Sequence, residues 1–121
     1  MSTYKSFRVE MFHDVAIVTV QAADLWDRAE ILHLQDELLD FIESEAPAKM
    51  ILDMASVGRV SSEALNVLIR LRDQEIARNA QLRLCKHYHA VTEVLRITEL
   101  ARLFDIYDSL PDAYRGFAEE S

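Results

Sequence analysis

The feature that most constrains this chain is an alternation of short strand-like runs with longer stretches of helical periodicity. Five runs have the length and the β-branched or aromatic content of strands, namely residues 7–12, 15–21, 50–54, 82–86 and 104–107. Helical periodicity covers residues 27–44, 62–79 and 91–98, and a fourth helix is predicted to begin near residue 109. Strands joined by helices pair in parallel, so this order predicts an α/β fold: a mixed sheet of four or five strands with about four helices.

The first two strands are predicted to form an antiparallel hairpin that turns at His13 and Asp14. The first strand alternates, and its apolar face is formed by Phe7, Val9 and Met11. The second strand is apolar throughout, which predicts that both of its faces are covered. Together the two strands supply the antiparallel part of the mixed sheet.

Local signals mark where the helices begin and end. Asp27 followed by Glu30 is typical of a capping box, and Ser109 is predicted to cap the final helix. Asn79 is predicted to end the helix over residues 62–79. The apolar side of that helix is predicted to consist of Leu65, Leu68, Ile69 and Ile76.

Length and charge narrow the class of partner. A chain of 121 residues is close to the commonest domain size, so a single domain is expected. Its 13 Lys and Arg residues against 21 Asp and Glu give a net charge of −8, which opposes binding to nucleic acid and to anionic membranes.

Cys85 is the only cysteine and lies in an apolar run, where a buried, unreactive thiol is expected. With no secretory signal and no apolar stretch long enough to insert into a membrane, the expected compartment is the cytoplasm.

The residues that could carry chemistry do not combine into a catalytic site. Two isolated glycines cannot form a phosphate-binding loop. His87 and His89 are the only close histidine pair, and no adjacent Cys or carboxylate completes a metal site. The strand over residues 50–54 is expected to be buried except near Asp53, which closes it. No base or second acid is positioned to act with Asp53 in catalysis. We therefore expect a protein that is not an enzyme and that binds no metal and no cofactor.

The informative segment is the passage from a strand-end loop into a helix at residues 53–65. Either Ser61 or Ser62 is expected to cap this helix by accepting a hydrogen bond from a free backbone N–H. The same place suits phosphorylation, because a helix N-terminus stabilises an anion and a phosphate changes the local charge by up to about two. A serine that caps the helix and a serine that is phosphorylated are compatible interpretations of this segment.

The segment Val60-Ser61-Ser62-Glu63-Ala64-Leu65 follows a strand that ends in Asp53, and it resembles the Asp-Ser-Ser-Gly-Leu motif of the STAS domain. Other segments resemble the same family at the same spacing: residues 82–85, 94–100 and 103–113. The resemblance of motifs covers residues 50–117, and residues 1–49 agree with the family in the order of their elements. It implies a single STAS-type domain over residues 1–121, similar to bacterial anti-sigma factor antagonists.

This resemblance implies a phosphorylation switch. In the family, the unmodified antagonist binds a serine kinase that doubles as an anti-sigma factor, and the kinase phosphorylates the first serine of the motif. That serine corresponds to Ser62, with Ser61 as the second choice. The residues that the resemblance implies for partner binding are Gly58, Arg59, Ser61, Ser62, Glu63, Leu65 and Asn66.

The chain departs from the family motif around the switch serine. Ser61 replaces the motif Asp, Glu63 the second Ser, and Ala64 and Asn66 the two glycines. Glu63 would repel a neighbouring phosphate, although the helix dipole partly offsets that repulsion. Two alternatives remain open: a STAS scaffold subunit of a signalling or transport complex that is not phosphorylated, and a domain that binds a small molecule such as a nucleotide.

Overall fold

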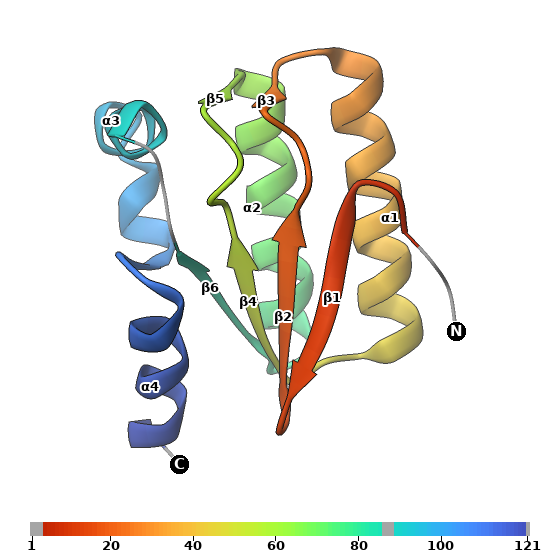
Figure 1. Ribbon diagram of the computed structural model, residues 1–121, viewed down its shortest axis with the longest axis vertical. Coiled ribbons are helices and arrows are strands. Elements are labelled where there is room, and N and C mark those ends of the chain that lie inside the picture. Colours follow the sequence, from red (N-terminus) through yellow and green to blue (C-terminus); the bar gives the residue numbers. More distant parts are fainter. Residues whose placement is uncertain (1–3, 86–88, 121) are drawn as a thin grey trace.

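The computed structural model describes residues 4–85 and 89–120, and a five-stranded mixed sheet organises them (Figure 1). In sheet order the strands are β1 (Phe7–Phe12), β2 (Val15–Val20), β4 (Lys49–Asp53), β6 (Gln81–Cys85) and β7 (Asp105–Tyr107). β1 is antiparallel to β2, and each of the other pairs is parallel. The predicted α/β class, the first hairpin and the mixed sheet are confirmed.

Two further strands form a small parallel pair outside the main sheet. They are β3 (Asp24–Leu25) and β5 (Arg59–Val60), and each is only two residues long. The sequence does not predict them, because two residues are too few to show the alternation of a strand. Their pairing is decided by where the large sheet places the two loops that contain them.

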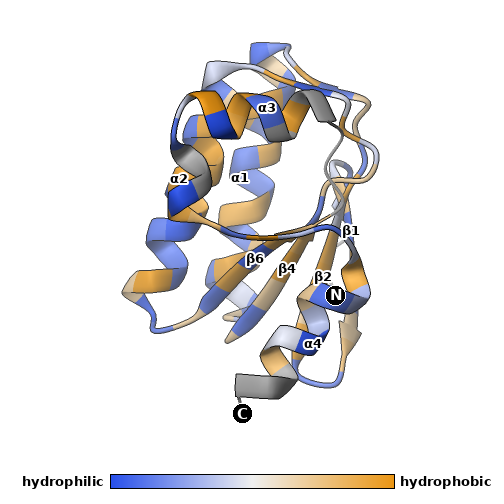
Figure 2. Ribbon diagram, turned by 90° about the vertical axis from the view of Figure 1, so that its left-hand side faces the viewer, coloured by the Kyte–Doolittle hydropathy of each residue, from blue (hydrophilic) through white to orange (hydrophobic). Residues whose placement is uncertain are grey.

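Helices cover both faces of the large sheet (Figure 1, Figure 2). α1 (Arg28–Glu45) and α2 (Ser62–Ala77) lie on one face, and α4 (Leu110–Glu120) lies on the other. α3 (His89–Ile97) and the short 3-10 helix η1 (Leu100–Leu103) lie between β6 and β7 in the chain. The four predicted helices are confirmed, and within the described residues none of them is long and apolar enough to cross a bilayer.

The predicted helix ends are largely confirmed by the hydrogen bonds that cap them. Asp27 accepts a bond of 3.1 Å from the backbone N–H of Glu30, and Ser109 accepts one of 3.2 Å from that of Asp112. Asn79 has a φ of 57°, the left-handed conformation expected just beyond a helix end. These signals are predictable because each depends on residues three or four apart in the chain.

Apolar side chains fill two cores, one on each face of the sheet. The larger core lies under α1 and α2 and includes Leu38, Leu52, Leu68 and Leu84, none of them more than 3% exposed. The smaller core lies under α4 and consists of Val15, Ile51, Cys85, Ala113 and Phe117. The predicted burial of Cys85 is therefore confirmed.

Two residues assigned to apolar faces lie at the surface instead. Met11 is 60% exposed, because β1 is an edge strand and its far end extends beyond the cover of α1. Ile76 is 53% exposed, because the buried line of α2 passes through Leu68, Leu71 and Glu75. Ile76 follows Glu75 by one residue, which turns its side chain by about 100° around the helix axis.

The smaller core also contains a buried arginine. Arg83 on β6 is 2% exposed, and its Nη1 donates a hydrogen bond of 2.8 Å to the hydroxyl of Tyr107. Its guanidinium carbon lies 4.0 Å from the centre of the Phe117 ring. A Cβ at Gly116 would lie only 1.9 Å from Arg83 Nη1, so the absence of a side chain at Gly116 makes room for the guanidinium.

Candidate functional site

The two serines at the start of α2 have different structural roles. Ser61 is the N-cap: its hydroxyl oxygen accepts a hydrogen bond of 3.3 Å from the N–H of Ala64. Its own N–H donates to the carbonyl oxygen of Leu25 at 2.9 Å. Ser62 is the first residue of the helix and is exposed. The alternative left open by the sequence is thus decided in favour of Ser61 as the cap.

The short β3–β5 pair ties the β2–α1 loop to the β4–α2 loop. Asp24 lies opposite Arg59, and Leu25 lies opposite Val60. The N–H of Gly58 extends the connection with a bond of 2.7 Å to a carbonyl oxygen of the β2–α1 loop. The start of α2 is therefore held in place by a second loop that is distant in the sequence.

The pairing of the two loops gathers exposed side chains around the start of α2. The guanidinium of Arg59 lies 3.4 Å from the carboxylate of Asp24 and 4.6 Å from the centre of the Trp26 ring. Trp26 itself is 54% exposed. Arg28, in the first turn of α1, lies 3.5 Å from the Glu63 carboxylate. We call the patch formed by Trp26, Arg28, Arg59, Ser62 and Glu63 the Ser62 surface.

The structure separates the predicted partner-binding residues into two groups. Arg59, Ser62, Glu63 and Asn66 are exposed and can contact a partner directly. Leu65 is 6% exposed and belongs to the core, Ser61 is the helix cap, and Gly58 is only partly exposed. Sequence reasoning missed Trp26 and Arg28, although a tryptophan immediately before a helix cap was a detectable signal.

Asp53 supports the loop rather than standing free at a strand end. It is 5% exposed, and its Oδ1 accepts a hydrogen bond of 2.9 Å from the N–H of Ala55. The expectation that the strand is exposed near Asp53 is therefore wrong. The reason is that the carboxylate turns back onto the backbone two residues ahead, which lets it be buried with a hydrogen bond satisfied.

The histidine pair considered as a metal site cannot be placed. His87 lies outside the described residues, as does the side chain of His89. Within the part of the chain that is described, no three His, Cys, Asp or Glu side chains gather closely enough to hold a metal ion.

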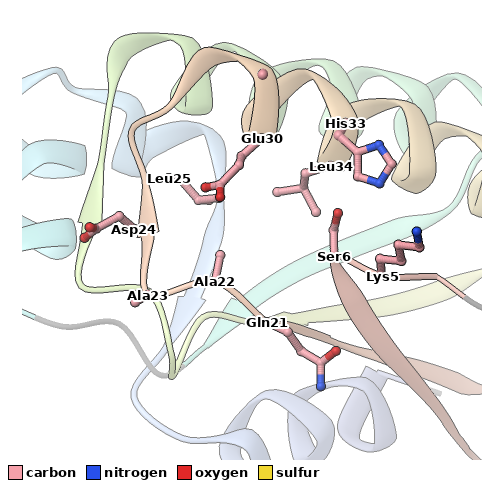
Figure 3. Close-up of a pocket in the computed structure, with 11 residues that line it drawn as sticks. Lys5, Ser6, Gln21, Ala22, Ala23, Asp24, Leu25, Glu30, His33 and Leu34 are labelled. Atoms are coloured by element: carbon pink, nitrogen blue, oxygen red, sulfur yellow. The ribbon is translucent and has the colours of Figure 1, made fainter.

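A groove of about 690 Å³ adjoins the Ser62 surface (Figure 3). It runs between α1 and the residues that flank β1 and β2, and it shares Asp24 and Leu25 with the loop that carries Trp26. Glu30 and His33 line it from α1, and Ser6 lines it from the segment before β1. Its walls are a mixture of apolar and polar groups that could hold a small molecule.

Glu37 fastens the segment before β1 to α1. Its two carboxylate oxygens accept hydrogen bonds of 2.9 Å from the N–H groups of Lys5 and Ser6, and His33 Nε2 lies 3.3 Å away. Burial alone would raise the pKa of Glu37, but the Ser6 hydroxyl and the two backbone N–H groups outweigh it and lower the pKa below its usual value. The carboxylate thus stays ionised and keeps one side of the groove in place.

Glu75 is a buried carboxyl group at the other end of α2. Its side chain is 1% exposed, and one oxygen lies 2.6 Å from Arg78 Nη1. The other oxygen accepts no hydrogen bond from the described residues. Burial raises the pKa of Glu75 to about 7, although the charge and the hydrogen bond of Arg78 act to lower it.

Comparison with known proteins agrees with this geometry. The family model of the STAS domain matches residues 7–113. The chain belongs to the STAS domain family. The resemblance seen in the sequence is confirmed, and the match includes the whole of the β4–α2 region that carries Ser62.

Solved structures share the fold at low sequence identity. A putative anti-sigma factor antagonist from Thermotoga maritima is 20% identical, with a TM-score of 0.81 over 91% of this chain and 92% of that one. The Bacillus cell fate determinant SpoIIAA in its phosphorylated form is 12% identical, with a TM-score of 0.68 over 92% and 98%. A sulfate transporter family protein from Wolinella succinogenes is 18% identical, with a TM-score of 0.72 over 93% of each chain. The fold thus occurs in proteins of more than one kind.

Proposed function

We propose that this chain is a non-enzymatic, cytoplasmic binding module that is switched by phosphorylation of Ser62. The observation that carries this proposal is the division of roles between the two serines. Ser61 already caps α2, and the hydroxyl of Ser62 accepts and donates no hydrogen bond within the described residues. A kinase can therefore modify Ser62 without removing the cap of the helix.

The charges around Ser62 make phosphorylation a strong signal. The N-terminus of α2 favours an anion, and Arg28 and Arg59 supply nearby positive charge. Glu63 is the adjacent residue, and its pair with Arg28 would compete with a phosphate for the same cation. Adding a dianion would therefore rearrange the charges of the Ser62 surface while leaving the fold beneath it unchanged.

The proposed partner is a protein, namely a serine kinase of the anti-sigma factor type or a related sensor. Trp26 stacked on Arg59 offers the kind of rigid aromatic and guanidinium contact that dominates protein interfaces. Two of the similar structures support the proposal: one is a putative anti-sigma factor antagonist, and the other is SpoIIAA in a phosphorylated form. The net charge of −8 argues against nucleic acid as the partner.

The first experiment asks whether the switch residue is modified in the cell. The protein is purified from its native host, its intact mass is measured, and the modified residue is mapped by fragmentation. We expect a fraction that carries one phosphate, located on Ser62. A phosphate on Ser61, or protein that stays unmodified under every growth condition, would contradict the proposal.

The second experiment measures binding to the kinase-type protein that co-purifies with the chain. Ser62→Asp should weaken binding at least about tenfold in titration calorimetry, because it adds a negative charge at the centre of the Ser62 surface. Ser62→Ala should retain the affinity of the unmodified protein. Ser56→Asp is the matched control, since Ser56 is an exposed serine of the same β4–α2 loop outside the Ser62 surface.

A second candidate function rests on the groove and on the transporter neighbour. A STAS domain without phosphorylation could serve as a scaffold subunit in a signalling or transport complex, as the Wolinella neighbour suggests. The groove of about 690 Å³ offers space for a small molecule in that form, and a nucleotide is the ligand to test first. A rise in melting temperature with added nucleotide, abolished by Ala29→Trp at an exposed position of the groove wall, would favour this function.

A further inference from the structure

The edge strand β1 is covered at its start and exposed at its end (Figure 1). It pairs with β2 along all six of its residues in an unbroken antiparallel register, and it contains neither proline nor glycine. Phe7 at its start is 1% exposed, whereas Met11 and Phe12 at its end are 60% and 53% exposed. Edge strands of this length usually carry a bulge, a proline or a cover that prevents pairing with another chain, and here the cover is the only one of these devices.

The cover is the segment over residues 4–6, which we call the strap. The Tyr4 ring stacks on that of Phe7 with the ring centres 4.7 Å apart, and it makes an edge contact with Phe41 of α1 at 6.1 Å. The Tyr4 hydroxyl donates a hydrogen bond of 2.9 Å to the carboxylate of Asp40 on the same helix. Tyr4 therefore connects the start of β1 to α1 and keeps water and other chains away from Phe7.

Glu37 on α1 holds the rest of the strap. Its two carboxylate oxygens accept hydrogen bonds of 2.9 Å from the backbone N–H groups of Lys5 and Ser6. Both bonds have an ionised acceptor, which makes them stronger than bonds between neutral groups. On the other side the carbonyl oxygen of Ser6 accepts the N–H of Gln21 at 2.8 Å. Every residue of the strap is thus fastened to α1, and Ser6 is fastened to the sheet as well.

The hydrogen bonds of β1 show which backbone groups the strap protects. Bonded and non-bonded pairs alternate along an antiparallel ladder, and Ser6 and Gln21 form a bonded pair. The N–H and C=O groups of Phe7, Val9 and Met11 therefore point away from β2. With Phe7 covered, only Val9 and Met11 are left to pair with another chain. An edge this short is one of the ways in which proteins prevent pairing between sheets.

We propose that the strap is a guard that keeps β1 from pairing with a second copy of this chain, and that its release opens this edge to self-association. Release uncovers the rings of Phe7 and Phe41, which lie 6.1 Å apart, and it adds Phe7 to the outward residues that can pair. The main sheet keeps its five strands, because the strap is not one of them. Exposed apolar surface and an open backbone edge then lie side by side, which is the combination that drives association between strands.

Sedimentation equilibrium tests the proposal on the full chain from about 10 μM to about 1 mM, at an ionic strength of about 0.15 M that screens the net charge of −8. Tyr4→Ala and Glu37→Ala should each raise the self-association constant at least about tenfold above that of the wild type. The first variant removes the ring that covers Phe7, and the second removes the two acceptors of the strap without touching that ring. Glu43→Ala, an equal change of charge at an exposed position of α1, should leave self-association unchanged.

Two further variants separate an opened edge from a general loss of stability. Val9→Pro, added to Tyr4→Ala, removes the central outward N–H, and an edge strand tolerates proline at such a position. The double variant should therefore return to the self-association constant of the wild type. Ser109→Ala, which removes the cap of α4 on the other face of the sheet, should lower stability without raising self-association. Equal self-association of the wild type, Tyr4→Ala and Glu37→Ala, or a gain that survives Val9→Pro, would overturn the proposal.

Discussion

Glu75 is a buried side chain that destabilises the folded protein when it is ionised. The carboxyl group is removed from water, and Arg78 satisfies only one of its oxygens. Its pKa rises from an ordinary 4.5 to about 7, so the native protein holds this proton to a higher pH than the unfolded chain does. The unfolded chain therefore gives up the proton first as pH rises, and the free energy of unfolding falls between pH 4.5 and 7.

Glu75→Gln should remove this pH dependence. The free energy of unfolding of the variant, relative to that of the wild type, should rise by about 3 kcal/mol between pH 4 and pH 8. The reason is that only the wild type must bury a charge at the higher pH. Urea unfolding of both proteins at several pH values measures the difference. Asp73→Asn, which alters an exposed carboxyl group on the same helix, is the control. A difference that is constant with pH would show that Glu75 ionises normally.

At this scale the sequence predicts what depends on near neighbours. The caps at Asp27 and Ser109 are confirmed because each involves a backbone N–H three residues ahead. The choice between Ser61 and Ser62 was not predictable, because it depends on the bond that Ser61 makes to Leu25 in another loop. The places of Trp26 and Arg28 beside Ser62 depend on the same loop pairing.

At the scale of elements, the β3–β5 pair decides the geometry of the candidate site. It joins two loops that follow neighbouring parallel strands, β2 and β4, at the same edge of the sheet. The order of strands along the chain was predicted from hydrophobic patterns, but their order in the sheet, which makes these loops neighbours, comes from the structure. The pairing itself was not predictable, because a two-residue ladder has no pattern of its own and follows from the sheet.

The start of α2 provides a test with a built-in control. Ser61→Ala should lower the free energy of unfolding by about 1 kcal/mol, because it removes the oxygen that caps the helix. Ser62→Ala should change it by less than about 0.5 kcal/mol, because Ser62 is exposed and already helical. Thermal and urea unfolding of the two variants give both values. Equal losses in the two variants would contradict the assignment of the cap.

At the scale of the whole molecule, two cores on opposite faces of one sheet hold the fold. The sequence predicted the class, the number of main strands and the four helices, because these follow from periodicity over many residues. It misplaced Met11 and Ile76, because burial at an edge strand or at the end of a helix depends on how far the neighbouring element reaches. The identity of the binding partner was not predictable from hydrophobic patterns. Those patterns report packing in the core, and exposed residues do not take part in that packing.

Leu68 and Ile76 provide a matched test of that core. Leu68→Ala should cost about 2–5 kcal/mol, because Leu68 is 3% exposed and its loss leaves a cavity under α2. Ile76→Ala should cost less than about 1 kcal/mol, because more than half of that side chain is already in water. Chemical unfolding of both variants measures the two losses in the free energy of unfolding. A loss below about 0.5 kcal/mol for Leu68→Ala would show that its face is assigned wrongly.

The contact between Arg83 and Gly116 has a consequence for how this sequence can change over generations. The guanidinium occupies the space that a side chain at position 116 would need, so a Cβ there has to displace the end of the buried Arg83 side chain. A substitution at Gly116 is therefore accommodated more easily in a descendant whose Arg83 has already been replaced by a shorter residue. The two positions, thirty-three residues apart, are therefore expected to change together over generations.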